Sequence, residues 1–462
     1  MSCSAPTQEL HFVIGGAGFL GSHIVDALVQ RGEKTVASFD IREPVAPIAG
    51  VQYYEGDLTD RDALAKALAD AQEDLGDSPK KERAGVVYHT ASPVAGLGPE
   101  LNEKVNVTGT NVVISVCQDE RNSVRKLVFT SSAGVVFTGQ DLIYVDERMQ
   151  PPEHPMDSYN DTKMRAEQAV LAANGKHHLL TIALRPAGIF GPGDRQALPG
   201  MFNVLATGRT KFQIGRNQNL FDWTYVGNVA HAHLLAADKL SAPEQYASSR
   251  LVEEHLPVRA LGVAERDTYR SVPLSVQRQD VPKPARDYAR NVQALIEIAP
   301  DQLDQHTVYR NRFDPFFSDA HPTAASAGNP NPAALNLARD AIPAAGEAFF
   351  ITNGQPICFW DFPRALWYRY NGHVDPRYIV LPLYVALVIA FLAECFSKLT
   401  GRPVQFTRYR VTYTGCTRFY NIEKARRILS YEPIVGMDEA IDRSVQWWKA
   451  AHPPHREAAK TK

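Results

Sequence analysis

The chain is poor in the residue patterns that build disulfide frameworks and zinc sites. Its five cysteines are widely scattered over 462 residues and form no Cys-x-x-Cys pair. This spacing argues against a disulfide scaffold and a structural zinc, and it suits a reducing compartment. We also find no cluster of His, Cys and Asp in the sequence, so the chemistry is expected to need no metal.

The sequence also lacks an excess of charge of one sign. Lys and Arg number 49 and Asp and Glu 51, a formal net charge of -2, so no chain-wide basic field favours a nucleic-acid partner. The first residues contain neither the basic region nor the apolar stretch of a secretory signal, so we expect chemistry that faces the cytosol. Hydrophobic residues make up 44% of the chain, which allows a substantial core.

A glycine cluster is the first positive feature. The apolar run His11–Ile14 enters Gly15-Gly16-Ala17-Gly18-Phe19-Leu20-Gly21, and apolar residues then recur at helical spacing. This pattern predicts strand, turn and helix. Gly15 and Gly18 would let the backbone turn tightly and approach a pyrophosphate, while Gly21 would let the helix pack closely on the strand.

A carboxylate follows the next predicted strand. Residues 35–39 form this strand, which ends at Asp40 about twenty residues after the glycines, where the carboxylate can bind the adenosine ribose. This favours NAD. Arg42 leaves NADP open because its guanidinium can accept a 2′-phosphate, although an anionic Asp40 would repel that phosphate.

The alternation of strand and helix continues through residues 51–54, 60–71 and 85–89, which predicts a parallel sheet. Asp57 at a strand end is placed to hydrogen-bond an adenine amino group, or to cap the following helix. His89 is expected to be structural. Asn106 would either place a water molecule or order its helix, and both interpretations stay open.

Strand-end hydroxyls and a Tyr-x-x-x-Lys pair supply candidate chemistry. The apolar run 126–130 ends in Ser131 and Ser132, and strand ends open onto the crevice of such sheets. Ser132, or Ser131 as the alternative, can hydrogen-bond a reacting oxygen. Tyr159 and Lys163 stand one helical turn apart, so we expect the ammonium to lower the pKa of the phenol and make it a proton acceptor for an alcohol.

These motifs resemble those of the extended short-chain dehydrogenase/reductase superfamily, which shares a Gly-x-x-Gly-x-x-Gly turn, a strand-end serine and Tyr-x-x-x-Lys. A narrower similarity is to the 3β-hydroxysteroid dehydrogenase family, and within it to the decarboxylating sterol-4α-carboxylate 3-dehydrogenases. It rests on residues 130–133, 157–163, 184–195 and 222–233 and covers about residues 10–240 and 346–450. The resemblance implies an α/β fold, a Rossmann-like doubly wound parallel sheet with a smaller C-terminal substrate-binding region.

The resemblance also implies a reaction. NAD, or NADP, would oxidise the 3β-hydroxyl of a 4α-carboxysterol to the 3-ketone with loss of the C4 carboxylate as CO2. Tyr159 would accept the proton beside Ser132 and Lys163. The cofactor contacts it implies are Gly15, Gly18, Phe19, Leu20, Gly21, Asp40, Asp57, Leu58 and Lys163. Arg195 would guide the substrate carboxylate or pin its own loop, and the loop role is favoured.

Three other functions share parts of this pattern. A 3β-hydroxysteroid dehydrogenase, or a related alcohol dehydrogenase or reductase, would oxidise or reduce without decarboxylation. An NAD-dependent nucleotide-sugar epimerase would use the same Tyr and Lys, but a long apolar segment argues against a sugar substrate. A non-catalytic dinucleotide-binding protein is expected to have lost the Tyr or the Lys, and both are present.

The predicted domain organisation follows from the extent of the resemblance. It comprises an NAD-binding domain at 8–195, a substrate-binding region at 196–240 and 346–452, a partly disordered insertion at 241–345 and a flexible tail at 453–462. The insertion is rich in Pro, Ala, Asp and Asn.

One segment of the substrate-binding region predicts contact with a membrane. Residues 379–393 are 15 uncharged residues interrupted by Pro382, fewer than the roughly 20 that span a bilayer. We expect a helix that dips into one leaflet, with a core helix as the alternative. With a sterol substrate, this predicts a monotopic or peripheral enzyme on the cytosolic face of the endoplasmic reticulum membrane. Other enzymes of sterol C4 demethylation are candidate partners.

Overall fold

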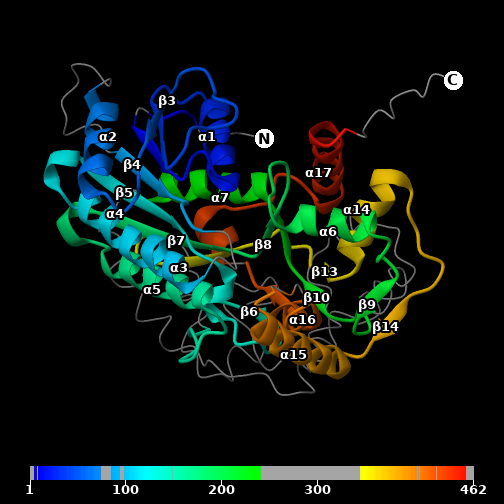
Figure 1. Ribbon diagram of the computed structural model, residues 1–462. Helices are drawn as coiled ribbons and strands as arrows, with labels where there is room; N and C mark the ends of the chain where they lie inside the picture. The colour runs from blue at the N-terminus through cyan, green and yellow to red at the C-terminus, as the bar shows by residue number, and fades with distance from the viewer. Residues whose placement is uncertain are drawn as a thin grey trace, which may run out of the picture.

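A seven-stranded parallel sheet forms the centre of the protein (Figure 1). The computed structural model describes residues 5–7, 9–73, 85–93, 98–147, 149–240, 344–402, 404, 406–422 and 424–453. The strand order is β12-β7-β5-β4-β1-β2-β3, and every pairing is parallel. The strands are β1 His11–Ile14, β2 Val36–Asp40, β3 Val51–Glu55, β4 Gly85–His89, β5 Val124–Thr130, β7 Leu180–Pro186 and β12 Ala348–Ile351.

Helices cover both faces of this sheet, which is why its central strands are continuous apolar runs. On β1, Val13 belongs to one apolar cluster, whereas Phe12 and Ile14 belong to the other, because successive side chains point to opposite faces. Helices α1 (Phe19–Arg31) and α7 (Val226–Lys239) contribute to the first cluster. The second takes in α2 Arg61–Glu73, α4 Thr110–Cys117 and α5 Ser158–Ala172.

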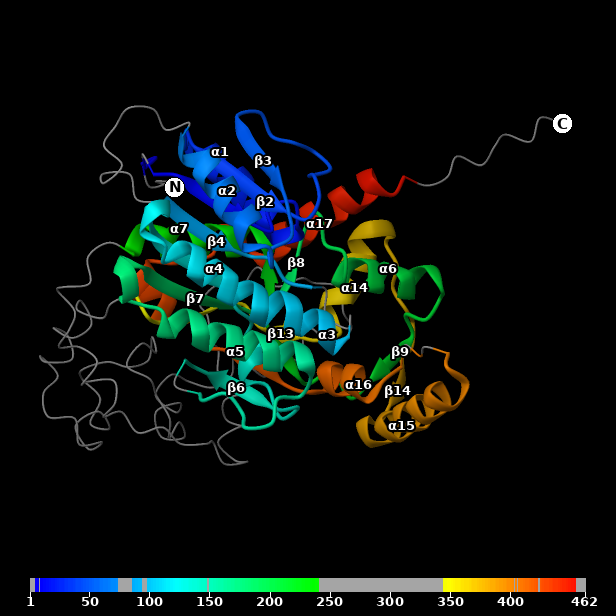
Figure 2. The same cartoon turned by 60° about the vertical axis from the view of Figure 1, so that its left-hand side comes forward.

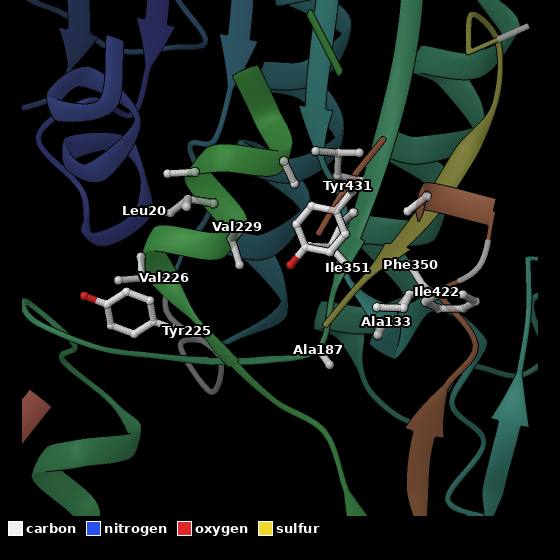
Figure 3. Packing of buried hydrophobic residues seen from close by; sticks show 14 of the residues in the cluster. Leu20, Ala133, Ala187, Tyr225, Val226, Val229, Phe350, Ile351, Ile422 and Tyr431 are labelled. Atoms are coloured by element: carbon white, nitrogen blue, oxygen red, sulfur yellow. The ribbon is translucent and has the colours of Figure 1, made fainter. Parts of the chain in front are cut away.

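The first cluster joins segments that are far apart in the sequence. Figure 3 shows Leu20 of α1 near Val226 and Val229 of α7, and Ile351 of β12 near Tyr431. All of these side chains are buried, with exposed fractions of 8% or less. Burial of this kind contributes about 1.5–3 kcal/mol for each large apolar side chain. The residues after the insertion therefore complete the core that begins at the N-terminus.

The predicted doubly wound parallel sheet is confirmed, and the expected strands and helices of the N-terminal part agree with β1 to β5, α1 and α2 to within two residues. The structure assigns two elements differently from the predicted domain boundaries. Helix α7 and strand β12 were expected in the substrate-binding region, but α7 packs beside α1, and β12 pairs with β7 as the seventh strand. Their buried apolar faces explain this, because only the central sheet offers a surface large enough to cover them.

A smaller lobe lies at the carboxyl end of the sheet strands. Its four-stranded sheet has the order β13-β10-β15-β6, and two short parallel pairs, β11-β8 and β14-β9, accompany it. The strands are β6 Leu142–Val145, β8 Gly188–Phe190, β9 Phe212–Ile214, β10 Leu220–Phe221, β11 Trp223–Tyr225, β13 Ile357–Cys358, β14 Ile379–Leu381 and β15 Arg418–Tyr420. The helices of this lobe are α6 Ala197–Ala206, α14 Asp361–Asn371, α15 Leu383–Thr400, α16 Arg408–Gly415 and α17 Met437–Ala451. The short helix α3 Pro99–Asn102 instead leads through residues 103–109 into α4 and contacts α5.

The apolar segment predicted at 379–393 takes two forms. Its first three residues are strand β14, Pro382 precedes the helix, and α15 then continues to Thr400. The alternative of a core helix is wrong, because only Ala386 and Ala390 of α15 are buried. Figure 2 shows α15 at the edge of the molecule, beside α16. The predicted insertion at 241–345, apart from Ala344 and Ala345, and the tail after residue 453 lie outside the described residues.

Candidate active site

The glycine turn joins β1 to α1 and packs too closely for side chains at Gly15 and Gly21. Gly15 has φ +88°, and a Cβ there would lie 2.7 Å from the Ala91 nitrogen. A Cβ on Gly21 would lie 2.1 Å from the Gly15 carbonyl oxygen, so α1 packs directly on the turn. Gly18 precedes α1 without a capping side chain, and the first turn has no acidic residue. An uncapped helix N-terminus reached through glycines fits the pyrophosphate of a dinucleotide.

Asp40 ends β2 beside this turn. Its Oδ2 accepts a hydrogen bond from the Ala17 amide at 3.0 Å, which fixes the carboxylate against the glycines. Burial raises the pKa of Asp40, although backbone amides and the charge of exposed Arg42 act in the opposite direction. Leu20 is buried, and partly buried Phe19 packs edge-on against His23. The cofactor roles of Asp40, Phe19 and Leu20 stay predictions.

Asp57 does not cap the helix that follows it. Asp60 does so, by accepting the amides of Asp62 and Ala63 at 3.1 Å. Asp57 instead accepts the Thr59 amide and the Lys104 ammonium, the latter at 2.7 Å, and the Lys104 hydrogen bond is the main reason why the pKa of Asp57 falls to about 2. The neighbouring Leu58 is buried against Gly109. Of the two roles left open for Asp57, helix capping is therefore wrong, and the contact with adenine stays a prediction.

Tyr159 lies at the start of α5, where its hydroxyl meets two strand-end serines. Hydrogen bonds join the phenol to the hydroxyls of Ser92, after β4, and Ser132, after β5. Ser132 Oγ also accepts the Gly134 amide at 3.0 Å. Asp157 caps α5 by accepting the Asn160 amide at 2.7 Å, which fixes the first turn and the Tyr159 side chain with it. The predicted neighbourhood of Tyr159 and Ser132 is therefore present in the structure.

Lys163 faces the same sheet edge one turn later, but its contact differs from the expected one. Its Nζ donates to the Thr130 carbonyl at 2.8 Å and lies 4.8 Å from the centre of the Phe129 ring. Burial lowers the pKa of Lys163 to about 7, against the favourable charge of Glu167. Burial also raises the pKa of Tyr159 to about 12. The expected lowering of the Tyr159 pKa by Lys163 is not seen: desolvation has the largest effect on the phenol, and the groups that lower its pKa are Ser92 and Ser132.

Asn106 orders this region through side-chain hydrogen bonds. It accepts the Ser92 hydroxyl at 2.9 Å and donates to the Thr162 hydroxyl at 3.0 Å. It thus connects the end of β4 to α5, the helix that carries Tyr159. This agrees with the predicted ordering role of Asn106, one of the two roles that the sequence left open. Ser92 escaped sequence reasoning, although it follows a buried strand in the same way as Ser132 and that pattern could have found it.

The other predicted residues lie outside this group. The Ser131 side chain is buried, and its hydroxyl has no hydrogen-bond partner within the described part of the chain, so Ser132 is the serine at Tyr159. His89 is buried and hydrogen-bonds Thr110 at 2.9 Å, as a structural residue would. Arg195 is exposed, and its loop is pinned by Asp194, whose carboxylate accepts the amides of residues 196, 197 and 198. The favoured loop-pinning role of Arg195 is wrong because Asp194 performs it.

The arrangement suits oxidation of an alcohol. A phenol, two hydroxyls and an ammonium converge at the carboxyl ends of β4 and β5, and the dinucleotide turn lies at the end of the adjacent β1. A substrate hydroxyl beside Tyr159 would meet a proton acceptor, and Ser132 would supply a hydrogen bond to the resulting carbonyl.

Comparison with known families agrees with this geometry. Residues 12–255 match the 3-beta hydroxysteroid dehydrogenase/isomerase family. The chain belongs to that family. It is 36% identical to the decarboxylating sterol-4-alpha-carboxylate 3-dehydrogenase of Schizosaccharomyces pombe, covering 94% of this chain and 95% of the relative. The enzyme of the same name from Saccharomyces cerevisiae is 34% identical, over 94% of this chain and 96% of its own length. The enzyme of that name from Homo sapiens is 30% identical, over 94% of this chain and 87% of its own length.

Solved structures share the fold at low identity. The UDP-glucose 4-epimerase of Thermus thermophilus in complex with NAD superposes with a TM-score of 0.54 at 17% identity, covering 96% of this chain and 99% of its own. The dTDP-glucose 4,6-dehydratase of Bacillus anthracis with NAD gives 0.54 at 13% identity, covering 96% and 97%. These similarities show a common Rossmann-like architecture.

Proposed function

We propose that this protein oxidises the 3β-hydroxyl of a 4α-carboxysterol with NAD and releases the C4 carboxylate as CO2. The observation that carries the proposal is the Tyr159 hydroxyl held between Ser92 and Ser132, in a chain similar over nearly its whole length to decarboxylating sterol-4-alpha-carboxylate 3-dehydrogenases of fungi and mammals. The decarboxylating relatives favour this reaction over a simple 3β-hydroxysteroid dehydrogenase. Likeness to epimerases is confined to the fold.

The residues present fit NAD, with the pyrophosphate at the Gly15 to Gly21 turn and the adenosine ribose at Asp40. Bound NAD would supply the hydride acceptor and, in its oxidised form, a positive charge that favours the Tyr159 phenolate. Asp40 is one reason to prefer NAD to NADP, since an anion at that position repels a 2′-phosphate.

The protein residues then account for the proton and the electron pairs. Tyr159 accepts the hydroxyl proton as the C3 hydrogen leaves as hydride, and the C3–O bond becomes a carbonyl. The Ser132 hydroxyl and the newly protonated Tyr159 would donate hydrogen bonds to that oxygen. The C3 ketone accepts the electron pair of the breaking C4–carboxylate bond as an enolate, which the same hydroxyls stabilise, and CO2 departs. A proton then returns to C4. Lys163, when protonated, would add a positive charge one helical turn from Tyr159.

Product analysis tests the proposed reaction against its competitors. Purified protein with NAD and a 4α-carboxysterol is expected to form NADH and a 3-ketone one carbon shorter. NADH without CO2 would favour a dehydrogenase that does not decarboxylate, and turnover of a UDP-sugar in place of the sterol would favour an epimerase.

The exposed face of α15 supports attachment to a membrane. Its large apolar side chains point away from the protein, with exposed fractions from 44% to 86%. They are Tyr384, Val388, Ile389, Phe391, Leu392, Phe396 and Leu399. On the other face, Ala386 and Ala390 pack on Val411 of α16, and Glu394 pairs with Arg408 at 2.8 Å. Contiguous exposed apolar surface of this kind marks a protein or membrane contact. We propose that α15 lies in one leaflet on the cytosolic face of the endoplasmic reticulum, near other enzymes of sterol C4 demethylation.

Substitution of the exposed face tests this attachment. The double variant Val388→Glu with Leu392→Glu is expected to shift the protein from the membrane pellet to the supernatant after carbonate extraction, because each carboxylate would have to enter the apolar layer. Val45→Glu is the matched control, since Val45 is 94% exposed in a loop after β2 and should have no effect. Clean release of the unsubstituted protein by carbonate would contradict an embedded helix.

A further inference from the structure

Arg418 on β15 is a buried cation enclosed by aromatic rings. Only 6% of the residue is exposed. The centre of its guanidinium lies 3.9 Å from the Tyr413 ring, 4.3 Å from the Phe137 ring and 4.8 Å from the Phe221 ring. Rings at these distances attract a cation through their faces, but a ring face does not accept the in-plane N–H bonds of a guanidinium.

Arg418 lacks the carboxylate that accompanies each of the other buried arginines. Among the described residues, Arg31 pairs with Glu33, Arg185 with Glu167, and Arg364 lies 3.8 Å from Asp361. Within the same part of the chain no acidic side chain lies within ion-pair distance of Arg418, and its Nε has no hydrogen-bond acceptor. Its guanidinium does hydrogen-bond the Tyr413 hydroxyl. A buried charge without a counter-ion is unfavourable, so a ligand that supplies the opposite charge would be stabilised beside Arg418.

The position of Arg418 connects it to the active site. Tyr413, its hydrogen-bond partner, is close enough to Tyr159 to raise the pKa of that phenol through an electrostatic interaction. Phe137 directly follows the short 3-10 helix Ala133–Val136, and Ser132 is the N-cap of that helix. Tyr409, one helical turn before Tyr413, hydrogen-bonds Asp157, the residue that caps the Tyr159 helix. The cation and the catalytic phenol therefore share one wall, formed by α16 and the segment after Ser132.

We propose that Arg418 is the binding site for the C4 carboxylate of the substrate. This inference rests on the proposed function. Carbons 3 and 4 of the sterol are bonded to each other, so a carboxylate on C4 must lie within a few ångströms of the hydroxyl that Tyr159 deprotonates. Arg418 is linked to Tyr159 through Tyr413, and its planar fork matches a carboxylate with two parallel hydrogen bonds. Arg195, the arginine that the sequence suggested for this role, is exposed instead.

Binding of the carboxylate by Arg418 would also distinguish the substrate from the product. The acid carries the charge that Arg418 recognises, whereas the 3-ketone that remains after loss of CO2 is neutral. Binding through Arg418 therefore favours the acid over the ketone, and release of CO2 removes the interaction that retained the sterol. A residue with only a packing role would affect acid and ketone alike.

The test compares a 4α-carboxysterol with its neutral methyl ester, both as substrates for NAD-dependent oxidation. In the Arg418→Gln variant, kcat/KM for the acid is expected to fall about 10- to 100-fold, the usual effect of losing a hydrogen-bonded charge, with little change for the ester. Inhibition by the 3-ketone and the affinity for NAD should stay unchanged. The Arg195→Gln variant is the matched control and should keep the acid-to-ester ratio of the unsubstituted enzyme.

The assignment would be overturned if Arg418→Gln left the acid-to-ester ratio of kcat/KM unchanged, whether both values fell equally or neither fell. It would also be overturned if only Arg195→Gln lost that ratio. If the Gln variant does not fold, the Arg418→Lys variant provides the test. Its single ammonium replaces the guanidinium, so the acid-to-ester ratio of kcat/KM should fall measurably but by less than in Arg418→Gln. An unchanged ratio in Arg418→Lys would contradict the proposal. Failure of the unsubstituted enzyme to oxidise the acid would instead overturn the proposed function.

Discussion

Replacement of Tyr159 by phenylalanine is expected to lower kcat for sterol oxidation by at least about 10³-fold, within the range that a general base contributes. Phenylalanine keeps the ring but removes the hydroxyl that lies between Ser92 and Ser132. Affinity for NAD should change less than about twofold, since the glycine turn and Asp40 are on other elements. Stopped-flow measurement of NADH formation, with NAD binding followed by fluorescence, gives both quantities.

The control for this variant is Tyr368→Phe. Tyr368 is 47% exposed on α14, so loss of its hydroxyl should leave kcat unchanged. The local fold should also survive in Tyr159→Phe, because Ser92 keeps Asn106 as a partner and Ser132 keeps the Gly134 amide. Turnover within tenfold of the unsubstituted enzyme would remove Tyr159 from the role of proton acceptor.

The second large effect concerns stability. Glu167 and Arg185 are both buried, and the Arg185 Nε donates to the Glu167 carboxylate at 2.9 Å, joining α5 to β7. Glu167→Ala leaves the guanidinium without this partner, which costs about 3–5 kcal/mol of unfolding free energy for a buried pair. Urea denaturation followed by circular dichroism is the measurement.

An exposed ion pair on the same helix is the comparison for this prediction. Arg165 of α5 pairs with Glu103 at the surface, where both side chains are more than a third exposed. Glu103→Ala should therefore cost less than about 1 kcal/mol, because water screens the pair and replaces its hydrogen bonds. If the two variants lose equal stability, the burial of Glu167 does not determine its contribution. Glu167 lies one turn after Lys163, so the buried pair also fixes the catalytic face of α5.

The sequence predicted those parts of the site that depend on local pattern. The glycine turn, Asp40 at the end of β2 and Tyr159 one turn before Lys163 follow from spacing within single elements, and the structure places them as expected. Ser132 was predictable because it follows a buried strand. In each case a period of two or 3.6 residues fixes the direction of the side chain.

Contacts between distant segments were not predictable in the same way. The Lys163 ammonium binds the Thr130 carbonyl, and burial raises the pKa of Tyr159, because β5 and α5 pack together over that region. Neither effect is encoded in a spacing of four residues. Arg418 gave no signal at all in the sequence, since its environment comes from α16, β10 and the turn after Ser132.

The apolar run at 379–393 shows a further limit. Its composition predicted an apolar helix but could not decide between a core and a surface position, because both exclude charge. The structure resolves this, since small residues Ala386 and Ala390 face α16 and the large side chains face outward.

The central claim is that one site both oxidises C3 and releases the C4 carboxylate. A 4α-carboxysterol with deuterium at C3 and ¹³C in its carboxyl group tests it directly. With NAD and the purified protein, we expect deuterated NADH and ¹³CO2 in a ratio of one to one. Deuterated NADH with the ¹³C retained in the sterol would contradict the account.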